Sequence, residues 1–258
     1  MGLNLIDTHA HLYAEEFAED ISEVIERAKD RGVDKVLLPN IDSTSVAGMK
    51  NLVQNHPDFF VPMMGLHPCS VQPETYQNEL KIAFKELQDG EYCAVGEVGM
   101  DLYWDTSTKD IQEEAFRLQC QWAHDMNLPL AIHSRNSTRE ILDVLQDLRP
   151  LNLKGVFHCF SGTENEAKEL IDLGFLLGIG GVVTFKNSGL KDEIKNIPLE
   201  HIILETDAPY LAPVPFRGKR NESSYVDHVA TFLADWYNLA KDEIATQTTA
   251  NAIRLFNL

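Results

Sequence analysis

The sequence predicts a single α/β domain, a (β/α)8 barrel that spans residues 1–258. Two observations lead to this prediction. Short, nearly continuous apolar runs alternate with amphipathic segments eight times, and no Pro-, Gly- or Ser-rich linker divides the chain. Such alternation is typical of a parallel sheet covered by helices, and eight units can close that sheet into a barrel.

Strands are expected where short apolar runs stop at polar or turn-forming residues. The first run, Leu3 to Ile6, leads into the segment Asp7-Thr8-His9-Ala10-His11. The predicted strands are 3–8, 33–38, 59–66, 93–97, 130–133, 153–158, 175–179 and 202–204.

Helices are expected between these strands, where apolar residues recur at helical spacing. In the first such segment, Ile21, Val24, Ile25 and Ala28 share one face, and Gly32 marks its end. The second helix has a candidate N-cap in Ser43 or Ser45. The predicted helices are 21–31, a helix from 43 or 45 to 53, 74–87, 108–126, 137–148, 164–173, a weak pattern at 190–195, 225–237 and 242–256.

An open, doubly wound sheet is the alternative architecture for the same alternation. Sheets of that kind that bind dinucleotides carry a Gly-x-Gly-x-x-Gly turn after the first strand. The residues that follow Ile6 contain no such turn, and this favours the barrel.

Composition narrows the class of protein. The chain is 44% hydrophobic and 24% charged, as in ordinary globular proteins, and no apolar run approaches the roughly 20 residues of a membrane helix. The first residues lack the basic start of a secretory signal, and the four cysteines are too far apart for a Cys-x-x-Cys motif. We therefore expect a cytoplasmic protein with reduced thiols, no membrane association and no obligate protein partner.

The net charge of −18 gives no support to a broad basic surface for nucleic acid. It does not exclude a phosphate substrate, because a divalent metal ion and a few local arginines can make a pocket positive while the outer surface stays acidic.

Polar residues gather at the ends of the predicted strands. Catalytic residues of barrels lie at the C-terminal ends of the strands, and His-x-His at a strand end aims two imidazoles at one point. The residues in this position are His9, His11, Glu97, His133, His158 and Asp207. Any one of these histidines alone would more simply be a core or loop histidine paired with a backbone carbonyl, but six such residues together predict a metal site.

A ligand set of nitrogen and carboxylate oxygen favours Zn, Mn, Fe, Co or Mg over a sulfur-rich structural site. We expect two ions, one held by His9, His11 and Asp207 and the other by His133 and His158, with Glu97 as the bridge. Two divalent ions about 3.5–4 Å apart can activate a water and stabilise both oxygens of an in-line displacement. Asp207 is also a candidate to take the proton of that water.

Several other residues are candidate substrate contacts. His67 ends the third strand and could contact the substrate or support a ligand, and Arg135 lies two residues beyond His133. Arg217 and Arg220 belong to a local basic cluster after the eighth strand, and guanidinium groups suit phosphate oxygens, although such clusters are often only solvated loops. The aromatic pair Tyr103-Trp104 follows Glu97 and could stack on a base or simply pack over the barrel mouth.

The sequence resembles the TatD family of metal-dependent deoxyribonucleases along nearly its whole length. The stretches that carry the resemblance are 7–12, 65–68, 96–101, 132–135, 158–162, 204–210 and 217–222. The resemblance implies a TIM barrel, metal binding at the six residues named above, and hydrolysis of DNA phosphodiester bonds, in some members as a 3′-to-5′ exonuclease on single strands and usually with Mg. The family often has an arginine just after the Gly-x-Asp motif, where this chain has Leu102-Tyr103-Trp104.

Three functions are therefore open from the sequence. The first is a metal-dependent phosphodiesterase acting on DNA, with two ions (Mg, Zn or Mn) and a single-stranded substrate. The second is a related hydrolase of a small ester, amide or phosphoester, because the same ions would polarise a carbonyl. The third is a binding protein that keeps the metal without cleaving, which the complete ligand set disfavours.

Overall fold

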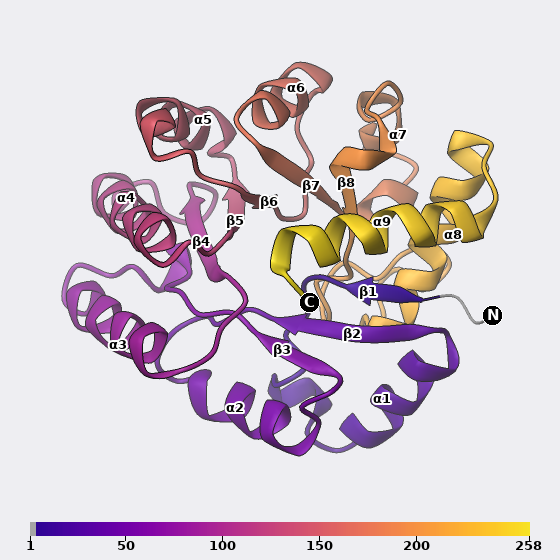
Figure 1. The fold of residues 1–258 in the computed structure, drawn as a ribbon, viewed down its shortest axis with the longest axis horizontal. Coiled ribbons are helices and arrows are strands. Elements are labelled where there is room, and N and C mark those ends of the chain that lie inside the picture. The colour runs from indigo at the N-terminus through magenta and orange to yellow at the C-terminus, as the bar shows by residue number, and fades with distance from the viewer. Residues whose placement is uncertain (1–3) are drawn as a thin grey trace.

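Eight parallel strands form a closed barrel in the computed structural model, which describes residues 4–258 (Figure 1). The strands are β1 (Leu5–Asp7), β2 (Val33–Leu38), β3 (Phe60–Pro62), β4 (Val95–Asp101), β5 (Leu130–Arg135), β6 (Gly155–Phe157), β7 (Phe175–Ile179) and β8 (Ile202–Leu204). The prediction of a (β/α)8 barrel is confirmed.

Two seams close the barrel where regular strand pairing stops. Between β3 and β4, the Met64 amide donates to the Ala94 carbonyl and the Gly96 amide donates to the Met64 carbonyl, at 3.1 and 3.0 Å. Between β8 and β1, the Thr8 amide donates to the Leu204 carbonyl at 3.0 Å. The first strand is thereby joined to the last, and the strand ends face one common mouth.

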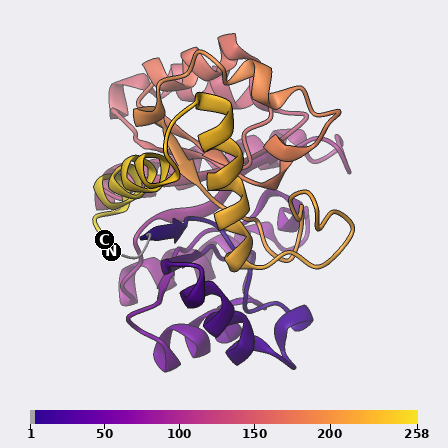
Figure 2. The same ribbon diagram turned by 90° about the vertical axis from the view of Figure 1, so that its right-hand side faces the viewer.

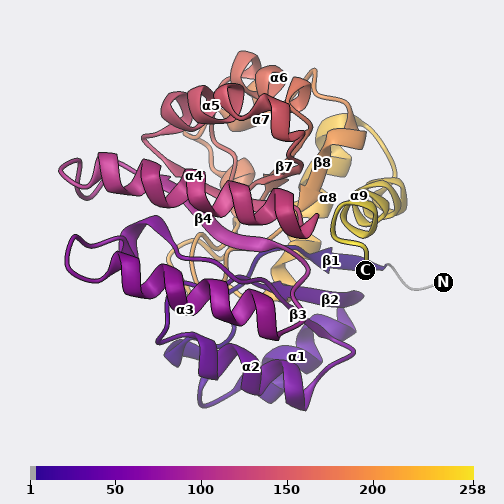
Figure 3. The same cartoon turned by 60° about the vertical axis from the view of Figure 1, so that its left-hand side comes forward.

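Helices surround the barrel and cover its outer apolar surface (Figures 1 and 3). They are α1 (Ile21–Asp30), α2 (Val46–Asn55), α3 (Tyr76–Asp89), α4 (Lys109–Met126), α5 (Thr138–Asp147), α6 (Glu164–Asp172), α7 (Leu190–Glu193), α8 (Val226–Tyr237) and α9 (Lys241–Phe256). Figure 3 shows α3 and α4 running side by side over one flank. Among residues 4–258, no helix is long and apolar enough to cross a membrane.

The barrel interior is divided between an apolar floor and a polar mouth. Each strand, or the residue beside it, sends one side chain into the floor, and these side chains are Ile6, Leu37, Met63, Ala94, Ala131, Val156, Leu176 and Ile203. Helix α9 lies across this end and adds Ala252, Leu255 and Phe256 (Figure 1). In Figure 2, α9 and the long loop that follows β8 lie on opposite sides of the barrel, so the mouth is at the end away from α9.

The predicted element boundaries agree with the structure to within a few residues, with three differences in the strands and one at a helix cap. The third strand, β3, ends at Pro62 rather than at Leu66. The predicted first strand begins at Leu3, which lies outside the described residues, and β4 continues to Asp101 rather than ending at Glu97. Ser45 does occupy the N-cap of α2, but its hydroxyl accepts hydrogen bonds from the amides of Ile41 and Asp42 instead of capping the helix. The expected cap interaction was wrong because the preceding turn uses that oxygen.

Candidate metal centre

The mouth of the barrel receives its polar side chains from the same strand faces that build the floor. Successive side chains of a strand alternate between the two faces, so a residue two positions beyond a floor residue also points inward. Ala131 is therefore followed by His133 on β5, and Val156 by His158 after β6. The floor and the candidate site are two stacked layers of one barrel interior.

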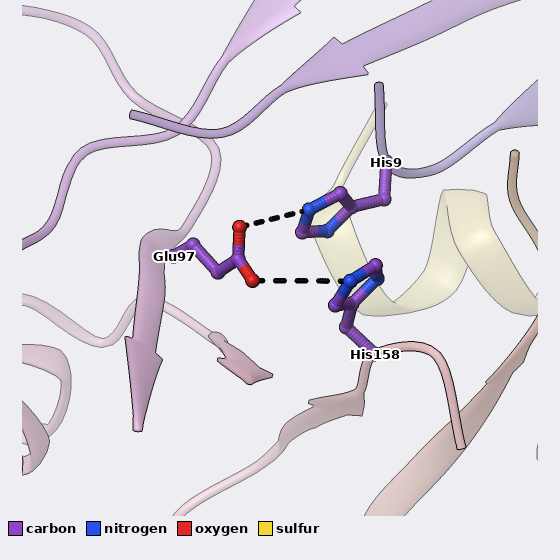
Figure 4. A group of neighbouring side chains, drawn as sticks. All are labelled: His9, Glu97 and His158. Atoms are coloured by element: carbon purple, nitrogen blue, oxygen red, sulfur yellow. Dashed lines mark hydrogen bonds and ion pairs between the residues drawn. The ribbon is translucent and has the colours of Figure 1, made fainter. Parts of the chain in front are cut away.

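Glu97 reaches the interior by a different route. Regular alternation after Ala94 and Gly96 would turn Glu97 outward. The pairing of β4 with β5 shifts here, since Gly96 lies opposite Ala131 and Val98 opposite Ile132, which makes Glu97 an extra residue in β4. A bulge of this kind redirects a side chain, and Glu97 points into the mouth (Figure 4).

The Glu97 carboxylate is the centre of the cluster. Its two oxygens lie 3.1 Å from Nε2 of His9, 3.4 Å from Nε2 of His11, 3.4 Å from Nε2 of His67, 2.9 Å from Nδ1 of His133 and 3.8 Å from Nε2 of His158. The side chain is only 3% exposed. Five imidazoles from distant parts of the chain thus surround one buried carboxylate, and Figure 4 shows two of them, His9 and His158, on its two oxygens.

A first group of potential ligands brings together residues that follow the first and the last strand, His9 and His11 after β1 and Asp207 after β8. Oδ1 of Asp207 lies 3.9 Å from Nε2 of His9 and 3.7 Å from Nε2 of His11. Asp207 has the left-handed φ of +59°, and its amide donates to the His9 carbonyl at 2.9 Å. This backbone turn brings the residues after β8 beside those after β1, as the predicted trio His9, His11 and Asp207 requires.

The remaining histidines are arranged differently from the expected pair. The ring of His158 stacks on His9 with centroids 3.4 Å apart, whereas the centroids of His158 and His133 are 6.4 Å apart. His133 instead groups with Glu97 and His67. His158 also lies 3.7 Å from Asp207, so it is within reach of both groups.

His67 has one ring nitrogen already engaged. Its Nδ1 accepts a hydrogen bond from the Cys69 amide at 3.0 Å, so in the neutral ring the proton is on Nε2, which faces Glu97. Burial lowers the pKa of His67, which favours this neutral form. The arrangement suits the predicted supporting or substrate-contacting role better than a ligand role.

Three residues that were not assigned a role hold the candidate ligands in place. Glu205 is fully buried, lies 3.0 Å from Nδ1 of His158 and accepts from the Cys159 amide at 2.7 Å. Oδ2 of Asp101 accepts from Nε2 of His133 at 2.9 Å, and the Tyr13 hydroxyl is 2.8 Å from Nδ1 of His11. Such partners orient metal ligands in proteins.

A signal for two of these residues exists in the sequence. Glu205 is a carboxylate two positions before Asp207 and two after the floor residue Ile203, which is the inward spacing of a strand. Asp101 ends a run that extends β4 beyond the expected strand. Tyr13 had no comparable signal, because it lies in a turn after β1.

The pKa values of the cluster reflect burial and mutual charge. Burial raises the pKa of Asp207 to about 6, and burial together with the His158 charge lowers the pKa of His9 well below its usual range. Burial would raise the pKa of Glu97, but the electrostatic contacts with the surrounding imidazoles and the hydrogen bonds from His11 and His133 outweigh it and hold this pKa well below normal. Burial would lower the pKa of His158, but the Glu205 charge outweighs it and raises this pKa to about 10.

The donor set fits a divalent metal ion. Ligand atoms that share one ion at about 2.0–2.2 Å lie roughly 3–4 Å from one another. The distances between carboxylate oxygens and imidazole nitrogens in the trio and around Glu97 are 2.9–3.9 Å, and several are too long for hydrogen bonds. Imidazole nitrogen and carboxylate oxygen suit Zn, Mn and related ions, and these side chains are compatible with metal binding.

The predicted arginine contacts already have protein partners. The Arg135 guanidinium lies 3.7 Å from the ring centroid of Tyr103, and that of Arg217 lies 4.0 Å from the centroid of Phe185. Arg220 makes two hydrogen bonds to Asp20, at 2.8 and 2.6 Å. Their contacts with a substrate remain predictions.

Comparisons with known proteins agree with this architecture. A family model described as "TatD related DNase" matches residues 6–257. An uncharacterized metal-dependent hydrolase of Bacillus subtilis, YabD, is 41% identical, over 98% of this chain and 99% of its own. A Pantoea vagans protein named "3'-5' ssDNA/RNA exonuclease TatD" is 31% identical, over 98% and 100%. The crystal structure of YJJV, a TatD homolog from Escherichia coli, superposes with a TM-score of 0.90 at 29% identity, with 98% of each chain covered.

Proposed function

Because this chain belongs to the family of TatD-related DNases, and its relatives in Bacillus subtilis and Pantoea vagans are named a metal-dependent hydrolase and an exonuclease, we propose that it is a deoxyribonuclease that hydrolyses phosphodiester bonds in DNA. We propose single strands as the substrate and 3′-to-5′ removal of nucleotides as the mode, as the name of the Pantoea relative states for that protein. The observation that carries the proposal is the buried carboxylate of Glu97, which five imidazoles surround at the mouth of the barrel.

The proposed cofactor is a pair of divalent ions, Mg, Zn or Mn. We assign His9, His11 and Asp207 to one ion and His133 and His158 to the other, with Glu97 between them. The position of His158 beside both groups supports a compact pair rather than two separate sites. When bound, these ions supply Lewis-acid chemistry, because they activate water and neutralise charge on phosphoryl oxygens.

The protein's own residues then handle the proton and the substrate charge. Asp207, whose carboxylate lies 3.7 Å from Nε2 of both His11 and His158 at the mouth, is the proposed acceptor of the proton from the attacking water. His67, Arg135, Arg217 and Arg220 are the proposed substrate contacts. The guanidinium groups would offset the developing charge on the phosphoryl oxygens.

The decisive experiment compares two substrate classes on metal-loaded protein: single-stranded DNA and a panel of small esters, amides and phosphoesters. We expect nucleotides to be released from DNA, and we expect Glu97→Ala to abolish this release. Turnover of a small ester without any nuclease signal would favour the alternative hydrolase. A preparation that binds metal and DNA but never cleaves would favour a binding protein.

Arg220 can be tested separately through the salt dependence of DNA binding. Each phosphate contact on a single strand contributes about −0.7 to the slope of log K against log salt concentration. We expect Arg220→Ala to weaken binding more at low salt than at high salt. If the slope is unchanged, Arg220 serves only to pair with Asp20 and is removed from the substrate site.

A further inference from the structure

Three planar side chains form an exposed cluster, here called the aromatic rim, that consists of Tyr103, Trp104 and Arg135. The rings of Tyr103 and Trp104 meet edge to face, with centroids 4.9 Å apart, and the Arg135 guanidinium lies 3.7 Å from the Tyr103 centroid and 5.2 Å from that of Trp104. Tyr103 is 51% exposed and Trp104 71%. No large apolar side chain among residues 4–258 is more exposed than Trp104.

The aromatic rim is attached directly to the candidate metal centre. The Tyr103 amide donates to Oδ1 of Asp101 at 3.0 Å, and the other oxygen of Asp101 accepts from His133 at 2.9 Å. Arg135 lies on β5 two residues beyond His133, and its carbonyl accepts from the Leu102 amide at 2.9 Å. A ligand on the rim would therefore lie beside the proposed reaction centre.

A packing role does not explain the exposed aromatic side chains. The start of the β4–α4 loop is held without them, because the amide and carbonyl of Asp101 bond to the Gln112 side chain at 2.8 and 3.1 Å. The Ser107 amide donates to Asp105 at 2.8 Å farther along the loop. A tryptophan that leaves most of its surface in water adds little to the stability of this loop.

We propose that the aromatic rim binds an unpaired base of the DNA strand whose phosphodiester bond lies at the metal centre, an inference that rests on the proposed function. Every base has a π-face that stacks on aromatic rings, and an arginine plane adds cation–π attraction. A base within a duplex has both faces covered by its neighbours, so an exposed aromatic face at this position favours single strands. In a chain with a net charge of −18, Arg135 also adds positive charge beside the strand's phosphates.

The test compares dT12 with a phosphodiester chain of equal length that has no bases. In a metal chelator, dT12 should quench the tryptophan emission of the protein and the base-free chain should not. Quenching by a ligand on the rim reports on Trp104, because the other two tryptophans lie elsewhere, Trp122 nearly buried in α4 and Trp236 in α8. Trp104→Phe should abolish the quenching.

Kinetics of the metal-loaded protein on dT12 provide the second readout. Trp104→Ala should raise KM about tenfold and leave kcat within about twofold, because stacking binds the ground state and the transition state alike. Trp104→Phe keeps a π-face and should hold KM within about threefold of wild type. Arg135→Lys keeps the charge but loses the planar stack, and should raise KM. The control is Leu118→Ala, an exposed side chain of α4 that should change neither constant.

The outcomes separate the two proposals. If DNA is cleaved but Trp104→Ala leaves KM unchanged, the aromatic rim is not a base site, while the nuclease function stands. If no preparation cleaves DNA, the proposed function fails, and the quenching experiment still judges the rim. Equal quenching by dT12 and by the base-free chain, or none by either, would overturn the base site.

Discussion

Glu205 offers a sharp test of how the fold prepares the candidate metal centre. Its carboxylate is fully buried and lies 3.0 Å from Nδ1 of His158. This contact favours the proton on Nδ1, so that the lone pair of Nε2 is available toward Glu97 and Asp207. Glu205→Gln keeps the shape of the side chain but removes the charge that orients the ring.

The expected loss follows from this one interaction. Substitutions of such supporting residues reduce metal affinity about 10- to 100-fold, which corresponds to roughly 1.4–2.8 kcal/mol. We expect Glu205→Gln to lie near the lower end of this range, because the amide keeps the shape of the side chain and a polar oxygen beside Nδ1. Glu205→Ala, which removes the acceptor, should lie near the upper end.

The assay is calorimetric titration of metal-free protein with Mn²⁺, with circular dichroism to establish that each variant is folded. The matched control is Glu200→Gln, whose carboxylate is exposed. If folded Glu205→Gln and Glu205→Ala both bind Mn²⁺ with wild-type affinity, then Glu205 does not position a ligand and the reasoning about His158 is refuted.

Three further predictions follow from the same structure. The Glu205 charge outweighs burial and raises the pKa of His158 to about 10, so metal binding should release about one proton near neutral pH. The apparent metal affinity should then rise up to tenfold per pH unit from pH 6 to 8. Calorimetric titrations in buffers of different ionisation enthalpy measure the proton release, and zero release would contradict this prediction. Gly99→Ala should prevent folding to a stable barrel, because a Cβ would lie 2.1 Å from the His133 carbonyl oxygen and the residue has a φ of +137°. Gly189→Ala has open space around it and should lower the free energy of unfolding by only about 1 kcal/mol. Thermal denaturation compares the two variants, and similar losses would refute the steric argument. Phe256→Ala should lower the free energy of unfolding, measured in urea titrations, by about 3–5 kcal/mol. Ile253 lies on the same helix but is 44% exposed, so Ile253→Ala should lower it by well under 1 kcal/mol, and equal effects would mean that α9 does not close the apolar end of the barrel.

Much of the architecture could be predicted because it depends on local patterns. Apolar runs and helical spacing depend only on neighbours in the chain, and they located the helices and strands to within a few residues. The strand-end positions of His9, His133 and His158 followed from the same runs. Their convergence was then a consequence of barrel closure, and the structure brings all six predicted ligands to one mouth.

The supporting contacts could not be predicted in the same way. The partner of Arg220 is Asp20, 200 positions earlier in the chain, and the loop cluster looked like a free basic patch in the sequence. Similarly, His158 stacks on His9 rather than lying beside His133, because ring orientation depends on Glu205 and on space across the barrel. Neither preference is encoded in spacing along the chain.

The sequence alone determined the barrel, the strand ends and the residue types able to hold a metal, because alternation and apolar periodicity are short-range properties. Only the tertiary structure decided that Glu97 turns inward, since the register shift that redirects it arises where β4 pairs with β5. It also decided which carboxylate supports which histidine. Those choices depend on distances between segments that are far apart in the chain, and such distances exist only once the barrel has closed.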